Sequence, residues 1–371
     1  MIKPFYLDLT ETEIEDIKEK LGEILKSGNL ILGKYTEEFE KEFADYIGTK
    51  YATALSTCTS ALEVLLTIRG AKGNKIAVPT NTNFATVAAI IKAGGIPVFL
   101  DMTHQYFVPS LDILKYTLDK YKDVKGVVWV HIGGVINPDF FEVVDYCKRN
   151  NIFLIEDCAH APGSQYQGIK AGNLADGGAF SFFPTKVMTT MEGGMITTNS
   201  EEEAKLAKAY RNQGKLDNFG GFHSYLGNSW RIDELSAYMG IVMLSKLDNM
   251  ITRRQWAVDT LIPTLEELGI DYVDTSHMDQ ASQYKFIIKF KNLKTIKEIK
   301  DQFREEGIIL GGGVYEVPCH LQPVFRELKY DREDVMISEE YCPNHFCPPI
   351  TSGLTELDVE QIITATKKVL R

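Results

Sequence analysis

The stretch that decides the fold runs from residue 151 to residue 199 and reads NIFLIEDCAHAPGSQYQGIKAGNLADGGAFSFFPTKVMTTMEGGMITTN. A continuous apolar run, Ile152 to Ile155, predicts a strand buried on both faces, as in a parallel sheet. The run ends in two acids, Glu156 and Asp157, and a second apolar run, GAFSFF, leads to Lys186. Since open α/β sheets gather their ligand chemistry at the carboxyl ends of strands, the stretch predicts an α/β fold with a site at that edge.

An acid and a lysine in this arrangement suit a pyridoxal cofactor. Such a cofactor bonds to a lysine amine through a Schiff base, and a carboxylate keeps its ring nitrogen protonated so that the ring accepts electrons. Lys186 and Asp157 are the candidates for these two roles. Taken singly, a lysine in a surface turn and an acid that caps a helix are the commoner interpretations of such residues.

Two motifs carry a resemblance to a known family. EDCAHA at residues 156–161 resembles the acid motif of the sugar aminotransferases of the DegT/DnrJ/StrS family, a branch of the fold-type I PLP-dependent enzymes. SFFPTK at residues 181–186, followed by EGG at residues 192–194, resembles their lysine motif. The resemblance extends over nearly the whole chain. It implies a large domain with a mainly parallel seven-stranded sheet and a smaller C-terminal α+β domain, which we place at residues 1–247 and 248–371.

The resemblance also implies where the phosphate of the cofactor binds. A short strand runs into Ser56-Thr57-Cys58-Thr59-Ser60, where a helix begins, and a helix N-terminus offers N–H groups and a favourable dipole to a phosphate. Thr59 and Ser60, together with Ser181, are the expected phosphate contacts. Simple N-capping of the helix by Thr59 or Ser60 is the alternative. The family usually has Gly-Thr where this chain has Cys58-Thr59, and a glycine where it has Met191.

Other implied contacts surround the cofactor ring. The family has an aromatic residue stacked on the ring at the position of Asn83, so Asn83 is the expected neighbour, and Phe84 in a shifted loop is the alternative. His160 stands where the family often has glutamine beside the cofactor. Asn228 or Ser229 matches an asparagine that reaches the phosphate of the neighbouring subunit, which implies a homodimer with shared active sites.

Substrate contacts are implied by the C-terminal part of the chain. The segment beginning at Tyr315 resembles the family's Tyr-x-x-Pro-x-His pattern, which makes Tyr315 and His320 the expected substrate contacts, with a structural loop as the alternative. Upstream, residues 233–268 predict a long helical stretch that Pro263 bends or breaks. Near the N-terminus, the spacing of apolar residues over 11–26 predicts a helix with one buried face that includes Leu21 and Leu25.

The composition argues against several classes of partner and location. The 371 residues carry 40 basic and 51 acidic side chains, a net charge of −11, so nucleic acid is not an expected partner. We expect no membrane span, because no apolar run approaches about 20 residues, and no signal peptide. The six cysteines form no CxxC pair, so we expect free thiols, no metal site and a cytoplasmic location.

The sequence therefore predicts a PLP-dependent aminotransferase that moves an amino group from L-glutamate to a keto-sugar, which we expect to be nucleotide-linked. In this prediction Lys186 bonds to the cofactor and then carries the proton as a free amine. Two alternatives stay open. A sugar dehydratase of the same family is disfavoured by Lys186, because those relatives have histidine there. A non-catalytic PLP-binding regulator is disfavoured by the joint presence of Lys186, Asp157 and the phosphate turn.

Overall fold

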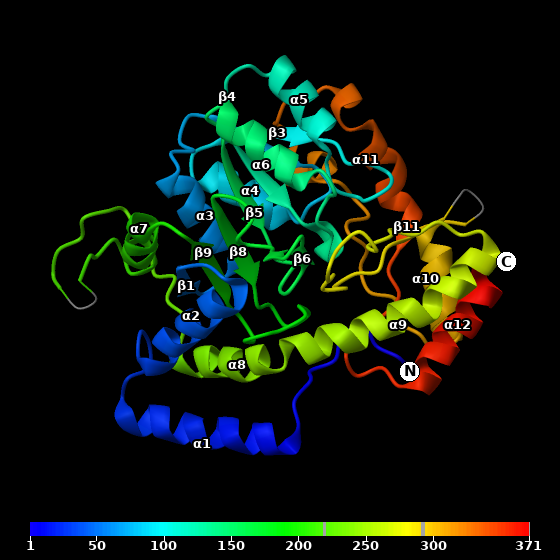
Figure 1. The fold of residues 1–371 in the computed structure, drawn as a ribbon, viewed down its shortest axis with the longest axis horizontal. Helices are drawn as coiled ribbons and strands as arrows, with labels where there is room; N and C mark the ends of the chain where they lie inside the picture. The colour runs from blue at the N-terminus through cyan, green and yellow to red at the C-terminus, as the bar shows by residue number, and fades with distance from the viewer. Residues whose placement is uncertain (218–219, 291–293, 371) are drawn as a thin grey trace.

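The computed structural model describes residues 1–217, 220–290 and 294–370 and is built around one central sheet (Figure 1). The sheet has seven strands in the order β1-β9-β8-β5-β4-β2-β3. β9 runs antiparallel to both of its neighbours, and the other adjacent pairs are parallel. The predicted α/β class with a mainly parallel seven-stranded sheet is confirmed. The strands of this sheet are β1 (Tyr51–Leu55), β2 (Lys75–Pro79), β3 (Ile96–Leu100), β4 (Val124–Val130), β5 (Phe153–Asp157), β8 (Gly177–Ser181) and β9 (Gly194–Thr198).

Helices cover both faces of the sheet (Figure 1). One buried cluster joins the sheet to α2, α5, α6 and α8 and includes Phe43, Trp129 and Phe140. A second cluster joins the opposite face to α3, α4 and α7. The helices of this part are α1 (Glu11–Ser27), α2 (Lys34–Ile47), α3 (Cys58–Ile68), α4 (Phe84–Lys92), α5 (Leu111–Lys120), α6 (Phe140–Arg149), α7 (Glu201–Arg211) and α8 (Glu234–Ser245).

The C-terminal part has a buried cluster of its own. It lies between the second half of α9, α10 and α12 and includes Phe286, Phe303 and Ile362, with Ile2 added from the N-terminus. This core suits the predicted smaller α+β domain, and the boundary between residues 1–247 and 248–371 stays a prediction. Its elements are α9 (Leu247–Leu268), β10 (Ile288–Lys289), α10 (Ile296–Glu305), α11 (Met336–Tyr341), β11 (His345–Phe346) and α12 (Glu356–Leu370), while β6 (Gln165–Tyr166) and β7 (Ile169–Lys170) form a hairpin beside the main sheet.

Two expectations about helices are correct only in part. The predicted helical stretch forms, but Pro263 lies inside α9 and does not break it, and the break falls at Lys246, between α8 and α9. α1 forms with a capping box between Thr10 and Glu13, but Leu21 and Leu25 are exposed, and Ile24 is its buried residue. The amphipathic spacing identified the helix, while the amount of surface it buries depends on what lies beside it.

Two further features agree with the composition. All six cysteines are buried and free. No helix among residues 1–217, 220–290 and 294–370 combines the length and the apolar character that crossing a bilayer requires.

Candidate active site

A cavity of about 350 Å³ lies at the carboxyl edge of the main sheet, where β5 and β8 end and α3 and α4 begin. The parallel order of β8 and β5 brings Ser181 and Asp157 to the same edge although they lie 24 positions apart (181 − 157) in the chain. The predicted site residues that line the cavity are Thr59, Asn83, Asp157, His160, Ser181, Lys186 and Tyr315. Ser60, Asn228, Ser229 and His320 do not line it.

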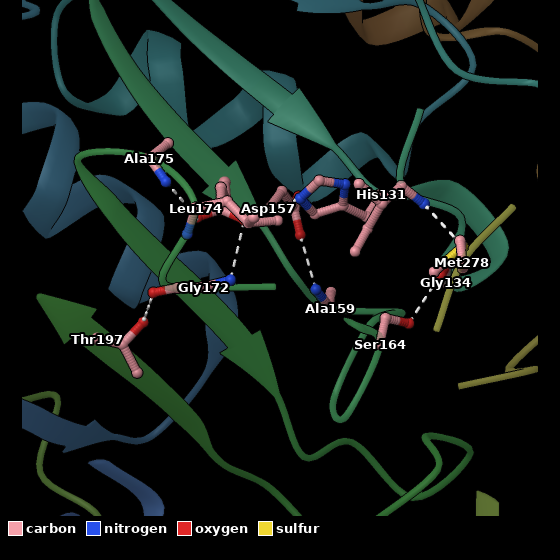
Figure 2. Close-up of polar contacts among 12 residues, drawn as sticks. His131, Gly134, Asp157, Ala159, Ser164, Gly172, Leu174, Ala175, Thr197 and Met278 are labelled. Atoms are coloured by element: carbon pink, nitrogen blue, oxygen red, sulfur yellow. Dashed lines mark hydrogen bonds and ion pairs between the residues drawn. The ribbon is translucent and has the colours of Figure 1, made fainter. Parts of the chain in front are cut away.

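Asp157 is the last residue of β5 and is buried at the bottom of the cavity. One carboxylate oxygen accepts the backbone N–H of Ala159 at 3.1 Å, as Figure 2 shows, and the other accepts the hydroxyl of Thr86 at 2.8 Å. Burial raises the pKa of Asp157, and these two hydrogen bonds and the charge of Lys186 oppose that rise. The acid is held in a single orientation by neutral donors, which leaves its charge available to a cationic ligand atom.

Lys186 lies in a turn after β8, with its amine over the ring of Tyr284 at 4.7 Å from the ring centre. In the part of the chain that the structure describes, Nζ has no hydrogen-bond or ion-pair partner. Burial raises the pKa of Tyr284, but Lys186, Lys285 and a hydrogen bond with Thr185 together bring it below its ordinary value. The amine is thus positioned by an aromatic face and remains open to covalent chemistry.

His160 forms one wall of the cavity and stacks against Tyr284, with 4.4 Å between the ring centres. Its Nδ1 accepts the backbone N–H of Gly133 at 3.2 Å. Burial, reinforced by the charges of Lys186 and Lys285, lowers the pKa of His160 well below its ordinary value. A neutral imidazole therefore faces the cavity.

The N-terminus of α3 meets the cavity as the motif predicted. Thr57 is the N-cap, and a capping box joins it to Ser60, whose backbone N–H donates to the Thr57 hydroxyl at 3.1 Å. Ser60 is buried in this capping role, whereas Thr57, Cys58 and Thr59 line the cavity. Cys58 starts the helix and is not among the residues with positive φ, so the turn forms without the glycine that the family usually has.

Gly194 of the EGG motif packs closely against this turn, which leaves no room for a side chain. A Cβ on Gly194 would lie 2.3 Å from the backbone carbon of Thr57, so a larger residue would push β9 away from the start of α3. Met191, in the position where the family commonly has glycine, keeps a positive φ of 70°. The left-handed backbone is therefore retained here by a residue that adopts it at a cost.

Asn83 lines the cavity and Phe84 does not. Asn83 is the N-cap of α4 and accepts the backbone N–H of Ala85 at 2.9 Å. Phe84 is 51% exposed and stacks on Phe325, with 5.7 Å between the ring centres. Of the two candidates for the ring neighbour, the structure places only Asn83 at the cavity.

Tyr315 and His320 have separate environments. Tyr315 lines the cavity, with its hydroxyl 3.2 Å from Nε2 of His160. His320 is buried outside the cavity, with its ring nitrogens 2.6 Å from the Thr80 hydroxyl and 3.3 Å from a carboxylate oxygen of Glu339. Both ring nitrogens of His320 therefore have partners outside the cavity, and its predicted contact with the substrate stays a prediction.

Asn228 and Ser229 lie on the exposed segment between α7 and α8. The side chain of Asn228 accepts the backbone N–H of Ser229 at 2.8 Å, and the Ser229 hydroxyl bonds to Arg231. Neither residue reaches the cavity of its own chain.

Thr86 and Tyr284 are among the cavity residues that the sequence analysis did not predict as site residues. Thr86 follows Asn83 by one turn of α4, and its spacing after β2 is the signal that could have identified it. Tyr284 comes from a segment about 100 residues beyond Lys186. No local pattern around Tyr284 predicts that the chain folds back onto the lysine.

A buried group beneath the site supports the end of β5. Ligand atoms of His131, Glu156 and Cys158 lie within 4.8 Å of one another. Both oxygens of Glu156 already accept hydrogen bonds, from Nε2 of His131 at 3.0 Å and from the backbone N–H groups of Gly172, Leu174 and Ala175. This saturation favours a structural role for Glu156 over metal binding.

Comparisons with known proteins agree with the geometry. The chain is 34% identical over 337 residues to a GDP-perosamine synthase of Vibrio cholerae, covering 90% of each chain. It is 32% identical over 343 residues to a GDP-perosamine synthase of Caulobacter vibrioides, covering 91% of each. Among solved structures, the PLP form of Spr1654 from Streptococcus pneumoniae superposes with a TM-score of 0.87 at 25% identity over 98% of both chains.

A family model covers almost the entire length. The model of the DegT/DnrJ/EryC1/StrS aminotransferase family matches residues 11–367, a span that includes the acid motif, the lysine motif and the segment of Tyr315. With the strand-end acid and the lysine of the lysine motif meeting in one cavity, the chain belongs to the DegT/DnrJ/EryC1/StrS aminotransferase family.

Proposed function

We propose that the protein is a PLP-dependent aminotransferase that moves an amino group from L-glutamate to a nucleotide-linked keto-sugar. The observation that carries this proposal is the amine of Lys186, without a hydrogen-bond or ion-pair partner among the described residues, in the same cavity as the buried carboxylate of Asp157. Two relatives at 32% and 34% identity are named GDP-perosamine synthase, which supports a nucleotide sugar as the acceptor. The product would be an amino sugar for a surface polysaccharide or a glycosylated metabolite.

The residues of the cavity fit the cofactor. The amine of Lys186 is free to bond with an aldehyde, and Asp157 has neutral partners that leave its charge for a ring nitrogen. The backbone N–H groups of Cys58 and Thr59 have no partner among the described residues, as phosphate binding at a helix start requires. We propose that Thr59 and Ser181 hold the phosphate, while Ser60 shapes the turn from behind.

Each side chain then has a stated task. When bound, PLP supplies an aldehyde that takes up amines and a ring that accepts the electron pair left at the adjacent carbon. Asp157 would hold a proton on the ring nitrogen, and its buried position would strengthen that interaction. The amine of Lys186 would take the proton from Cα of the amino donor and deliver it to the cofactor carbon that carried the aldehyde.

We further propose that the enzyme is a cytoplasmic homodimer with shared active sites. Asn228 and Ser229 are exposed and do not reach their own cavity, as expected of residues that serve a neighbouring copy. Leu226, close by, is fully exposed, which suits a side chain that a second chain covers. The chemistry of six buried free thiols suits a reducing compartment.

The first experiment asks whether Lys186 binds the cofactor. Wild-type protein with PLP should show the visible absorbance band of a lysine-bound cofactor, and Lys186→Ala should lack it. Lys170→Ala, which alters a lysine of the same stretch outside the cavity, is the matched control and should keep the band. A band that survives in Lys186→Ala contradicts the assignment.

A second experiment separates an aminotransferase from the alternatives. L-glutamate should bleach the band and release 2-oxoglutarate, and a panel of nucleotide-linked and free keto-sugars should restore it. A regulator would bind PLP without this cycle. A dehydratase would consume the sugar and retain no nitrogen in the product, which mass spectrometry detects.

A further inference from the structure

A second lysine amine lies close to the cavity. Nζ of Lys285 is 5.3 Å from the centre of the Tyr284 ring, and Nζ of Lys186 is 4.7 Å from the same centre. The two amines are therefore at most 10.0 Å apart, the sum of these two distances. Within residues 1–217, 220–290 and 294–370, Nζ of Lys285 has no hydrogen-bond or ion-pair partner. Lys285 does not line the cavity, and the proposed reaction does not use it.

The Lys285 amine packs against a run of three glycines at residues 311–313. A Cβ on Gly311 would lie 2.7 Å from Nζ of Lys285, so the amine occupies the space that a side chain at this position would need. The backbone N–H groups of Gly311 and Gly312 have no acceptor in the part of the chain that the structure describes. Lys285, Gly311 and Gly312 thus form a niche of unused donors, which we call the Lys285 niche.

The acid nearest to the niche in the same loop is already paired. Glu316 accepts the backbone N–H of Gly313 at 3.3 Å and forms an ion pair with Lys300. Burial and the charges of Lys186 and Lys285 lower the pKa of His160, so the charge of Lys285 acts on the wall of the cavity. The niche therefore keeps a positive charge that is available to an anion.

Both segments of the Lys285 niche continue into the cavity wall. Tyr284 precedes Lys285 and Tyr315 follows Gly311 by four positions, and both tyrosines line the cavity. Lys285 and Gly311 are half-buried and Gly312 is exposed, so the niche is open to solvent. A ligand with one end at Lys186 can therefore extend into the niche.

The donors of the niche suit phosphate oxygens. A lysine amine is a compact point charge, and backbone N–H groups in glycine-rich loops approach phosphates closely because no side chain stands between them. We propose that the Lys285 niche binds the diphosphate of the nucleotide-linked keto-sugar while its keto carbon lies at Lys186. The choice of a nucleotide sugar rests on the proposed function, whereas the anion chemistry of the niche rests on its unused donors. A sugar ring with its diphosphate spans the separation of the two amines.

Binding can be measured without turnover. The PLP-loaded protein, in which the cofactor fills the phosphate site at α3, is titrated with GDP, dTDP and inorganic pyrophosphate in a calorimeter. We expect Lys285→Met to weaken pyrophosphate binding by at least about tenfold, and Lys285→Arg to restore most of the affinity. Lys297→Met, which removes an exposed lysine of α10, should bind as the wild type does. Unchanged affinity in Lys285→Met, or a wild-type protein that binds none of the three ligands, overturns the inference.

The two glycines give a matched pair of variants. Gly311→Ala should displace the Lys285 amine, whereas a methyl group on Gly312 meets no atom within 4 Å. Neither glycine has a positive φ, so alanine fits both backbone conformations. We expect Gly311→Ala to weaken pyrophosphate binding as Lys285→Met does, and the double variant to be no worse than Lys285→Met alone. Gly312→Ala should keep the wild-type affinity, and equal affinities of the two alanine variants overturn the inference.

Kinetics separates the two substrates of the proposed reaction. Lys285→Met should raise KM for the nucleotide-linked keto-sugar by about tenfold and leave KM for L-glutamate unchanged. A raised KM for L-glutamate with unchanged pyrophosphate binding would assign Lys285 to a carboxylate of the amino donor and overturn the inference. A protein that binds pyrophosphate through Lys285 but transaminates no sugar refutes the proposed function and leaves the niche standing. An active transaminase whose pyrophosphate binding is independent of Lys285 refutes the niche alone.

Discussion

Two opposing effects act on the pKa of Asp157. Burial raises the pKa of its carboxyl, while the N–H of Ala159, the hydroxyl of Thr86 and the charge of Lys186 favour the ionised form. A buried carboxylate with only neutral hydrogen-bond partners gains most from a cation placed beside it. The residue is therefore suited to a ligand that brings its own positive charge.

The first prediction concerns this charge. Asp157→Asn keeps the shape, and its amide oxygen can still accept the N–H of Ala159, but it removes the negative charge, so kcat should fall by at least about a hundredfold at saturating PLP. The measurement is the rate of 2-oxoglutarate release. Asp145→Asn, at an exposed position on α6, should keep wild-type kcat. An Asp157→Asn enzyme within about threefold of the wild type would remove the proposed role of the acid.

Departures from the family pattern are tolerated for local reasons. Cys58 can replace glycine because the position begins α3 with an ordinary backbone conformation. Met191 replaces glycine where φ is 70°, which an L residue adopts at a cost of about 1–2 kcal/mol. The replacement of a glycine is thus free of strain at the start of α3 and strained beside the EGG motif.

Among the elements, α2 and α8 are joined by one carboxylate. Glu234, in the first turn of α8, accepts the backbone N–H groups of Gly33 at 3.0 Å, Tyr35 at 2.9 Å and Thr36 at 3.0 Å. These are the groups that the start of α2 leaves without helical partners, and Gly33, its N-cap, has no side chain to satisfy them. Glu234 of α8 therefore caps the N-terminus of α2.

The second prediction follows from this cap. Glu234→Ala should lower the free energy of unfolding by about 3 kcal/mol, because several buried N–H groups lose their acceptor. Urea unfolding at neutral pH measures the change. Glu38→Ala, an exposed acid on α2, serves as the comparison and should change stability by less than about 0.5 kcal/mol. Equal urea midpoints for the two variants would contradict the prediction, because they would show that water can replace Glu234 as the acceptor for the N–H groups at the start of α2.

At the scale of the whole molecule, His345 forms hydrogen bonds that connect the loop carrying Tyr315 to Tyr341 of α11. Its Nε2 accepts the backbone N–H of Val314 at 2.7 Å, and its Nδ1 lies 3.3 Å from the carbonyl of Tyr341. Burial lowers the pKa of His345 from 6.5 to about 4. The neutral form is the one that fits the fold.

The third prediction is the resulting pH dependence. As pH falls, the unfolded chain binds a proton at His345 before the folded chain does, so stability present above about pH 6.5 is lost on the way to about pH 4. His345 alone should contribute a loss of about 2 kcal/mol between pH 7 and pH 5. The difference between the urea midpoints at the two pH values should become smaller in His345→Gln by the contribution of this one histidine, while His223→Gln, at an exposed histidine, should keep the wild-type difference.

The fourth prediction concerns assembly. Leu226 is 101% exposed and Phe222 91% exposed on the segment that carries Asn228, an arrangement that suits contact with a second copy. Leu226→Glu should raise the dimer dissociation constant by at least about tenfold in sedimentation experiments. Leu357→Glu, at a residue of α12 that is 76% exposed, should sediment as the wild type does. A wild-type protein that is monomeric at all concentrations would refute the shared site.

The residues that the sequence located well share one physical property. Asp157, Ser181 and Lys186 follow buried strands, and parallel strands bring their ends to one edge, so reading the strands was enough to bring these side chains together. The start of α3 was recognisable for the same reason, because a helix that follows a strand begins at that edge. The class of fold and the heart of the site thus follow from local patterns.

Other features depended on contacts between distant segments. Tyr284 reaches Lys186, Tyr315 reaches His160, and His320 turns away into its own loop, and no local pattern distinguishes these outcomes. Pro263 stayed within α9 although proline disfavours a helix interior, because the helix packs there against a core of its own. The sequence by itself determined the sheet, the acid and the lysine, since each is encoded by neighbouring residues. Only the tertiary structure decided which tyrosines and which histidine face the ligand, because burial and hydrogen-bond direction arise from segments that meet after folding.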